Sequence, residues 1–295
     1  MRGMWRRSPR LERLIPCPWG EHAVTVRDYE TLATRLQAAV ASVSPPLKLR
    51  VYGQQATPEG AEPQEVYDLF LVDVPARTRA PRFSVLLNGG THGDEPAGAE
   101  ALVRFLEERR DTRWPDVAFT ITPCTNPWGY AHDTREGPGG ADLNRSFRRA
   151  TRRTPQVTLY KQAMRRRTFD LLVDCHEDVD TPGLYVFAPT ALGQAIVRAV
   201  RPLGPVHEGD LVDGEIPLNG SVVELDSERM RERQRSWNTW PLPFYVGRYH
   251  RRGASGIDFA INSATVETPV TLPMDQRIAM HLAAIDAALA TLSDK

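Results

Sequence analysis

Cysteine is scarce in this sequence, and its few positions exclude one class of fold. Only Cys17, Cys124 and Cys175 occur among 295 residues, too scattered for a disulfide framework or a C-x-x-C pair. Long apolar runs are absent as well: none approaches the roughly 20 residues of a membrane span, so no membrane association is expected. The basic opening segment lacks the apolar stretch of a signal peptide. We therefore expect a soluble, cytoplasmic protein.

The sequence also lacks an excess of charge of either sign. Lys and Arg total 37, as do Asp and Glu, so no global field favours nucleic acid or an acidic lipid surface as a partner. Arginines cluster at 148–153 and 165–167, which we interpret as solvated helix surface. With 41% apolar and 25% charged residues, the composition is that of an ordinary globular protein with a substantial core.

What the sequence does contain is an alternation of short apolar runs and amphipathic stretches. Strands are predicted at 83–88, 117–122, 169–174, 184–187 and 263–266, and helices at 27–43, 95–110, 155–167 and 274–292. This alternation predicts an α/β fold with a mixed or mostly parallel sheet and helices on both faces. Ligands of such sheets bind beyond the carboxyl ends of the strands.

One stretch, 208–246, breaks this rhythm and has few periodic features. Because long irregular segments inside a compact domain are usually functional, we expect it to form loops beside the active site. Whether these loops act as a lid stays open. A single domain is predicted, in which residues 1–80 supply an N-terminal helix and strands and residues 81–295 form the core.

The most informative segment, G-G-T-H-G-D-E-P-A-G, occupies positions 89–98 directly after a predicted buried strand. His92 and Glu95 lie three residues apart on a glycine-rich turn, so an imidazole and a carboxylate can converge on one ion. The spacing is common by chance. The alternative is a helix N-terminus at which Asp94 and Glu95 face the helix dipole.

A second histidine follows another predicted strand. His176 ends the run L-L-V-D-C-H, and two histidines with one glutamate form an established zinc set that leaves a position open for water. Asp174 or Asp142 could orient the imidazoles, as metal-bound histidines usually require. Strand alternation should point Cys175 to the opposite face, so we expect it in the core.

A third group of residues suits an anionic substrate. Asn144 and Arg145 are adjacent, and a guanidinium group can bind a carboxylate bidentately while the amide adds a donor. Arg135 could stabilise the negative charge that develops on a carbonyl oxygen.

Together these motifs resemble the zinc carboxypeptidase superfamily, which includes carboxypeptidase A, murein peptide amidases and the succinylglutamate desuccinylase/aspartoacylase-like deacylases. The matching text is H-G-D-E at 92–95, N-P-x-G at 126–129, Arg135, D-L-N-R-x-F at 142–147, D-x-H at 174–176 and V-E-T-P at 266–269. The resemblance implies a central mixed sheet of about eight strands, with residues 81–295 as a zinc hydrolase core. It also implies one Zn2+ per chain.

The resemblance further implies a role for each matching residue. His92, Glu95 and His176 correspond to the metal ligands. Glu267 corresponds to the base that activates the zinc-bound water, and Arg135 to the arginine that polarises the scissile carbonyl.

Other matches concern the substrate. Asn144 and Arg145 correspond to the pair that binds the terminal carboxylate. Tyr249 corresponds to the substrate-closing tyrosine, with Tyr245 as its competitor. Ile257 corresponds to the base of the side-chain pocket, which implies an apolar or neutral terminal residue. Alternatively, Arg251 or Arg252 enters this pocket and selects an acidic terminus.

We therefore expect a zinc-dependent metallocarboxypeptidase that hydrolyses an amide bond next to a free carboxylate in a small peptide. The alternative is an N-acyl amino acid deacylase or a murein peptide amidase, because those substrates also present a carboxylate. A helix is predicted after Glu267, where aspartoacylase relatives carry a β-rich domain, and this favours the carboxypeptidase branch. A catalytically inactive carboxylate-binding module is the alternative from another class.

Overall fold

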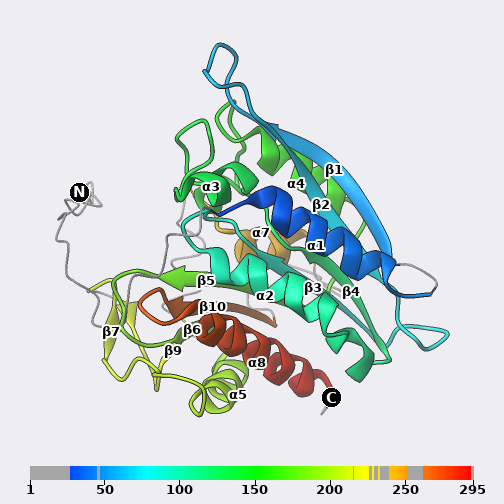
Figure 1. Ribbon diagram of the computed structural model, residues 1–295. Helices are drawn as coiled ribbons and strands as arrows, with labels where there is room; N and C mark the ends of the chain where they lie inside the picture. The colour runs from blue at the N-terminus through cyan, green and yellow to red at the C-terminus, as the bar shows by residue number, and fades with distance from the viewer. Residues whose placement is uncertain are drawn as a thin grey trace.

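The computed structural model describes residues 27–44, 47–214, 216–225, 228, 232, 239–250 and 262–293. In this part of the chain, eight strands form one sheet in the order β1-β2-β4-β3-β5-β10-β6-β9 (Figure 1). Their bounds are β1 Lys48–Ala56, β2 Val66–Val74, β3 Phe83–Gly89, β4 Val117–Thr122, β5 Leu171–Asp178, β6 Tyr185–Ala188, β9 Val222–Glu224 and β10 Ser263–Pro269. A separate ribbon pairs β7 (Leu211–Val212) with β8 (Ile216–Pro217).

The sheet is mixed, and its centre is parallel. Strands β4, β3, β5 and β10 run in one direction, so their carboxyl ends meet at one edge. Antiparallel pairs flank this centre: β2 joins β4 and β1 joins β2 on one side, and β6 joins β10 on the other. Strand β9 then pairs with β6 in parallel. The predicted mixed, mostly parallel α/β fold is confirmed.

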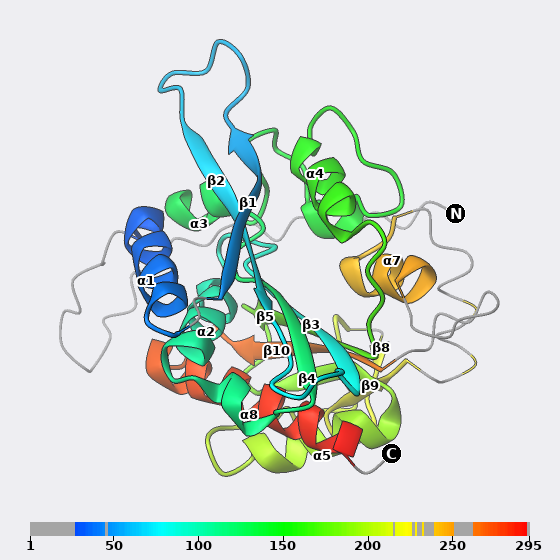
Figure 2. The ribbon, with the colours of Figure 1, turned by 90° about the vertical axis from the view of Figure 1, so that its right-hand side faces the viewer.

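Helices cover both faces of the sheet (Figure 2). Helices α1 (Tyr29–Ala41), α2 (Pro96–Glu107), α5 (Thr190–Val200) and α8 (Met274–Ser293) bury one face under the larger apolar core. Helices α4 (Pro155–Met164) and α7 (Leu242–Tyr249) bury the other under a smaller core. The short helix α3 (Pro127–His132) and 3-10 turns at Arg110–Arg113 and Leu143–Arg145 lie in the connections. Among the described helices, none combines the length and apolarity needed to cross a membrane.

Alternation along the central strands separates the apolar core from the polar face. In β5, Val173 and Cys175 point into the larger core, whereas Leu172 belongs to the smaller one. Asp174 and His176 therefore share the face of Leu172, on the side of α4 and α7. Cys175 is 1% exposed and lies in the core, as predicted.

The predicted central elements occur close to their expected positions. Strand β4 has the predicted bounds, and α2 begins one residue late because Pro96 occupies the first helical turn, where its missing N–H costs nothing. The expectation of loops throughout 208–246 is wrong in part, because β7, β8, β9 and the first turn of α7 lie within this range. Strands of two or three residues are too short to show a periodic pattern.

A buried ion pair ties the end of β5 to both α2 and α8. Glu177 is 3% exposed, and its carboxylate accepts a hydrogen bond from the backbone N–H of Ala97 at 2.6 Å. Its other oxygen pairs with Arg277 of α8, whose side chain is 12% exposed. Glu177 thus satisfies a free N–H at the start of α2 and interacts with its positive dipole end.

We predict that Arg277→Met lowers the free energy of unfolding by about 3–5 kcal/mol, because Glu177 is then buried without its partner. Asp275→Asn on the same helix is the matched control. It removes an exposed pair with Arg104 and should cost below about 1 kcal/mol. Urea unfolding of both variants measures the difference, and equal losses would contradict the prediction.

Candidate metal centre

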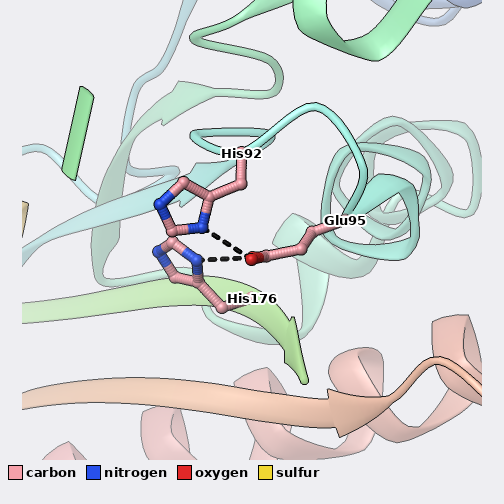
Figure 3. Close-up of side chains that lie close together, drawn as sticks. All are labelled: His92, Glu95 and His176. Carbon is pink, nitrogen blue, oxygen red and sulfur yellow. Dashed lines mark hydrogen bonds and ion pairs between the residues drawn. The ribbon is translucent and has the colours of Figure 1, made fainter. Parts of the chain in front are cut away.

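The three predicted ligands converge at the carboxyl edge of the parallel strands (Figure 3). His92 and Glu95 lie on the turn between β3 and α2, and His176 lies in β5. One potential ligand atom from each of the three residues lies within 4.8 Å of the others. All three side chains are buried, with relative exposures of 3%, 4% and 1%. Such a cluster is what a metal site requires, and a helix start alone does not explain it.

The Glu95 carboxylate bridges the two imidazoles. It contacts Nδ1 of His92 at 2.6 Å and Nδ1 of His176 at 2.7 Å. The backbone N–H of Glu177 donates a third hydrogen bond to it at 3.1 Å. Burial alone would raise the pKa of Glu95, but His92 and His176 outweigh that effect and hold this pKa well below its usual value.

The second ring nitrogen of each imidazole contacts a further carboxylate. Nε2 of His92 contacts Asp142 at 3.2 Å, and Nε2 of His176 contacts Asp174 at 3.2 Å. Asn88 in turn donates to Asp174 at 2.7 Å. These contacts direct both Nδ1 atoms inward, as in histidines that bind a metal through one nitrogen and donate from the other. The donor set and its orientation therefore fit Zn2+.

Close backbone packing holds the turn that carries His92. A Cβ atom on Gly93 would lie 1.9 Å from the carbonyl carbon of Gly129, so only glycine fits there. Gly90 has φ +57, and its added Cβ would meet Cys124 at 2.9 Å. The glycines of the motif therefore allow the metal-binding turn to lie directly on the loop that begins α3.

Glu267 lies on β10, beside β5. In the parallel register it is opposite His176, and by alternation it shares the face of Thr265 rather than that of the core residue Val266. Burial raises the pKa of Glu267 to about 8, an effect that Glu95 reinforces and that His176 opposes. The structure thus places the predicted base beside the ligand cluster.

Arg135 also reaches the cluster. Its Nη1 lies 3.0 Å from Glu95, and its Nε donates to Asp142 at 3.3 Å. The Arg135 side chain is 39% exposed, so a ligand can reach it from solvent.

Asn144 and Arg145 lie on the 3-10 turn that follows Asp142. Asn144 is buried, and its Oδ1 accepts the backbone N–H of Leu242 at 2.9 Å, so only its amide NH2 group can serve a ligand. Arg145 is exposed, and it lies close enough to Asp142 to lower the pKa of that carboxyl. The carboxylate-binding pair predicted from the sequence is thus adjacent to the metal cluster.

The two candidate tyrosines differ in their surroundings. Tyr245 is 7% exposed, and its hydroxyl lies 3.0 Å from Nε2 of His250. Tyr249 is 61% exposed at the end of α7, where its ring packs against Trp240 and Tyr245. Ile257, Arg251 and Arg252 lie outside the described residues.

Two polar residues near the site were not identified from the sequence. Tyr185 pairs with Glu267 in the antiparallel register of β6 and β10, and its hydroxyl donates to Asp178 at 2.8 Å. Asp213, at the turn between β7 and β8, has its pKa raised by burial and by Asp178, whereas Arg145 opposes the shift. Neither belongs to a motif, and Asp213 reaches this region only because the β7–β8 ribbon packs on β6.

Comparison with known proteins agrees with this architecture. The family model of the succinylglutamate desuccinylase/aspartoacylase catalytic domain matches residues 81–188, the segment that contains all three predicted ligands. No curated protein matches the sequence of this chain.

Several solved structures share the fold at low sequence identity. A provisionally named metallopeptidase from Shewanella amazonensis has a TM-score of 0.68 and 20% identity, covering 90% of this chain and 94% of its own. A metallo-carboxypeptidase from Burkholderia cenocepacia has a TM-score of 0.63 and 20% identity, with coverages of 90% and 69%. A metallo-carboxypeptidase from Pseudomonas aeruginosa has a TM-score of 0.60 and 16% identity, covering 90% of this chain and 68% of its own.

The fold and the convergent His–Glu–His cluster are those expected of a metallohydrolase. The family-model match over residues 81–188 and the shared architecture agree with the superfamily that the motifs of the sequence had indicated.

We predict about one zinc ion per purified chain and none in a His92→Ala, His176→Ala double variant, because both Nδ1 donors are then lost. His132→Ala is the control, since this exposed histidine of α3 contacts Glu65 and not the cluster. Elemental mass spectrometry gives the stoichiometry. Zinc retained in the double variant would place the metal elsewhere.

Metal affinity should increase as pH rises. Burial disfavours a charged imidazole, but Asp174 and Glu95 outweigh burial and hold the pKa of His176 well above its usual value. A proton therefore competes with the metal for this nitrogen until the pH passes the raised pKa. In the metal-free protein, this proton contributes stability that is complete below the unfolded pKa and is lost as pH rises through the folded one. Zinc titrations at several pH values test the sign, and weaker binding at higher pH would contradict it.

Proposed function

We propose that this protein is a zinc-dependent metallocarboxypeptidase that hydrolyses the amide bond next to a free carboxylate. One observation carries the proposal: the buried His92–Glu95–His176 cluster has Glu267 beside His176 in the sheet and Arg135 in contact with Glu95, at the edge where the parallel strands end. A base, a metal set and a cation around one point are the components that amide hydrolysis requires.

Glu267 serves as the general base. When bound, Zn2+ lowers the pKa of a coordinated water molecule and polarises a carbonyl oxygen. Glu267 takes a proton from the attacking water and passes it to the leaving nitrogen. The pKa of about 8 applies to Glu267 when no cation is bound by His92, Glu95 and His176. A positive charge at that cluster lowers the pKa of Glu267 towards the neutral range.

Arg135 stabilises the oxygen of the scissile carbonyl. Its guanidinium group is fixed by Glu95 and Asp142, and its side chain is partly exposed. A fixed cation is more effective than a mobile one, because it needs no reorganisation when charge develops. Asn144 and Arg145, on the next turn, bind the substrate carboxylate and so set which amide bond is presented.

Names of similar structures support the peptidase form of this proposal. The Shewanella amazonensis and Burkholderia cenocepacia proteins carry metallopeptidase names and overlap 90% of this chain. The Pseudomonas aeruginosa structure holds (2-guanidinoethylmercapto)succinic acid, a ligand with carboxylate groups. We infer a small peptide with a free carboxyl terminus as the substrate.

A second candidate is deacylation of an N-acyl amino acid. It is favoured by the family model that matches residues 81–188, which describes desuccinylase and aspartoacylase catalytic domains. The same residues serve both reactions, because each substrate places a carboxylate next to the cleaved amide. N-blocked dipeptides and N-acetyl amino acids, assayed separately for release of the free amino acid, distinguish the two.

We predict that Glu267→Gln lowers kcat by at least about 100-fold, because the amide cannot accept the proton of water. Zinc content should stay unchanged, since Glu267 is not among the three ligands. Assays of the zinc-loaded variant on the best substrate measure the effect. Full turnover by the variant would show that another group is the base.

We predict that Arg145→Ala raises KM by about 10–100-fold for substrates with a free carboxylate, because a charge-assisted hydrogen bond is lost. Substrates with an amidated terminus should bind equally to both enzymes. Arg149→Ala, a nearby exposed arginine, is the matched control and should leave KM unchanged. An equal KM change on the amidated substrate would remove Arg145 from carboxylate recognition.

A further inference from the structure

We infer that Gln55, on the edge strand β1, is a positioning residue for Arg135. It acts through Asn126, whose side chain holds the backbone of the Arg135 segment. The catalytic consequence rests on the proposed function of Arg135, whereas the structural link does not. Gln55 lies in the N-terminal part of the chain, outside every motif that indicated the site.

The burial of Gln55 is unusual for its strand. β1 forms the outer edge of the sheet (Figure 2). All its other residues are exposed or half-buried. Gln55 alone is buried, at 1% exposure. An amide side chain enclosed on an otherwise open strand must have its hydrogen bonds satisfied by the protein.

Those bonds lead to the loop that begins α3. Nε2 of Gln55 donates to Oδ1 of Asn126 at 2.9 Å, and Oε1 of Gln55 accepts the backbone N–H of Trp128 at 2.8 Å. The N–H of Gly129 also donates to Oδ1 of Asn126, at 3.2 Å. Gln55 therefore holds the first turn of α3 and, together with the N–H of Gly129, the orientation of the Asn126 amide.

Asn126 is fully buried and passes this constraint to the Arg135 segment. Its Nδ2 donates to the carbonyl oxygens of Arg135 at 3.3 Å and of Glu136 at 3.1 Å. The two amide atoms of Asn126 face opposite ways, and the donors from Gln55 and Gly129 both reach Oδ1, so Nδ2 points at the loop. Without Gln55, only the longer bond from Gly129 favours this amide orientation.

The Arg135 segment is also joined directly to the metal-binding turn. The N–H of Gly93, next to His92, donates to the carbonyl oxygen of Thr134 at 3.0 Å. Consecutive carbonyl groups at 134, 135 and 136 are therefore bound from two sides, by the metal turn and by Asn126. The Arg135 side chain extends from this fixed backbone, and its guanidinium group contacts Glu95.

A small shift of this backbone matters for catalysis. Displacement of a charge-stabilising group by about 1 Å can cost 100-fold in rate, even when the substrate still binds. Gln55→Leu leaves Oδ1 of Asn126 and the N–H of Trp128 with one partner fewer, at a site closed to water. We expect the Arg135 segment to lose its fixed position while the metal ligands stay in place.

The experiment compares Gln55→Leu with Gln54→Leu. Gln54 is the neighbouring glutamine on β1, and its Nε2 bonds the side chain of Asp68 at the surface. In Gln55→Leu, we expect faster hydrogen exchange in peptides covering residues 127–137 and about a 10–100-fold lower kcat, with KM and zinc content unchanged. Gln54→Leu should match the original protein in all four measurements.

A double-mutant cycle with Arg135→Ala tests the route of the effect. If Gln55 acts through Arg135, Gln55→Leu should change kcat by less than about 2-fold in the Arg135→Ala background. An undiminished loss in that background overturns the inference. So does a loss of kcat without faster exchange in 127–137, or unchanged kcat and exchange in the single variant.

Different results would contradict the role of Gln55, the role of Arg135 and the proposed function. If Arg135→Ala turns over as fast as the original protein, the proposed role of Arg135 is wrong, whatever Gln55 does. If no zinc-dependent turnover is found with either substrate class, the proposed function fails. Hydrogen exchange in peptides covering residues 127–137 then still shows whether Gln55 holds the Arg135 segment in place.

Discussion

The site is organised by one buried carboxylate that bridges two imidazoles. Glu95 is enclosed at 4% exposure and is held by His92, His176 and the N–H of Glu177. A charge in such a place is tolerated only when its surroundings compensate for it fully. The parallel strands make this possible, because β3 and β5 end side by side and bring the two histidines to one point from positions 84 residues apart in the chain.

Much of this arrangement could be predicted from the sequence, because motifs and strand ends coincide. His92, Glu95 and His176 each follow an apolar run of a kind that buried parallel strands show, and the sheet brings such ends together. Strand alternation correctly separated Cys175 from His176. Asp174, two residues before His176, could be named as its supporting partner for the same reason.

The remainder depends on contacts between segments that share no motif. Asp213 reaches the site from a two-stranded ribbon whose strands are too short to give a pattern. Gln55 reads as an ordinary polar residue of an edge strand, and only tertiary packing makes it the buried member of that strand. Asn126 belongs to the N-P-x-G motif, yet its link to β1 depends on how α3 lies against the sheet. Sequence patterns indicate which face of a helix or strand is buried. They do not indicate which residues, distant in the chain, pack against that face.

The balance of charges explains why the cluster suits a divalent cation. It also explains how the metal-free protein tolerates the cluster. Glu95, Asp142, Asp174 and Glu267 bring carboxylates to the site, with Asp178 and Asp213 nearby, against the guanidinium groups of Arg135 and Arg145. With neutral imidazoles the carboxylates outnumber the cations, and a divalent cation offsets this excess. In the metal-free protein the pKa of His176 is raised by neighbouring carboxylates and that of Glu267 by burial, so protonation offsets part of the same excess. A bound cation competes with these protons, which is why metal affinity should depend on pH.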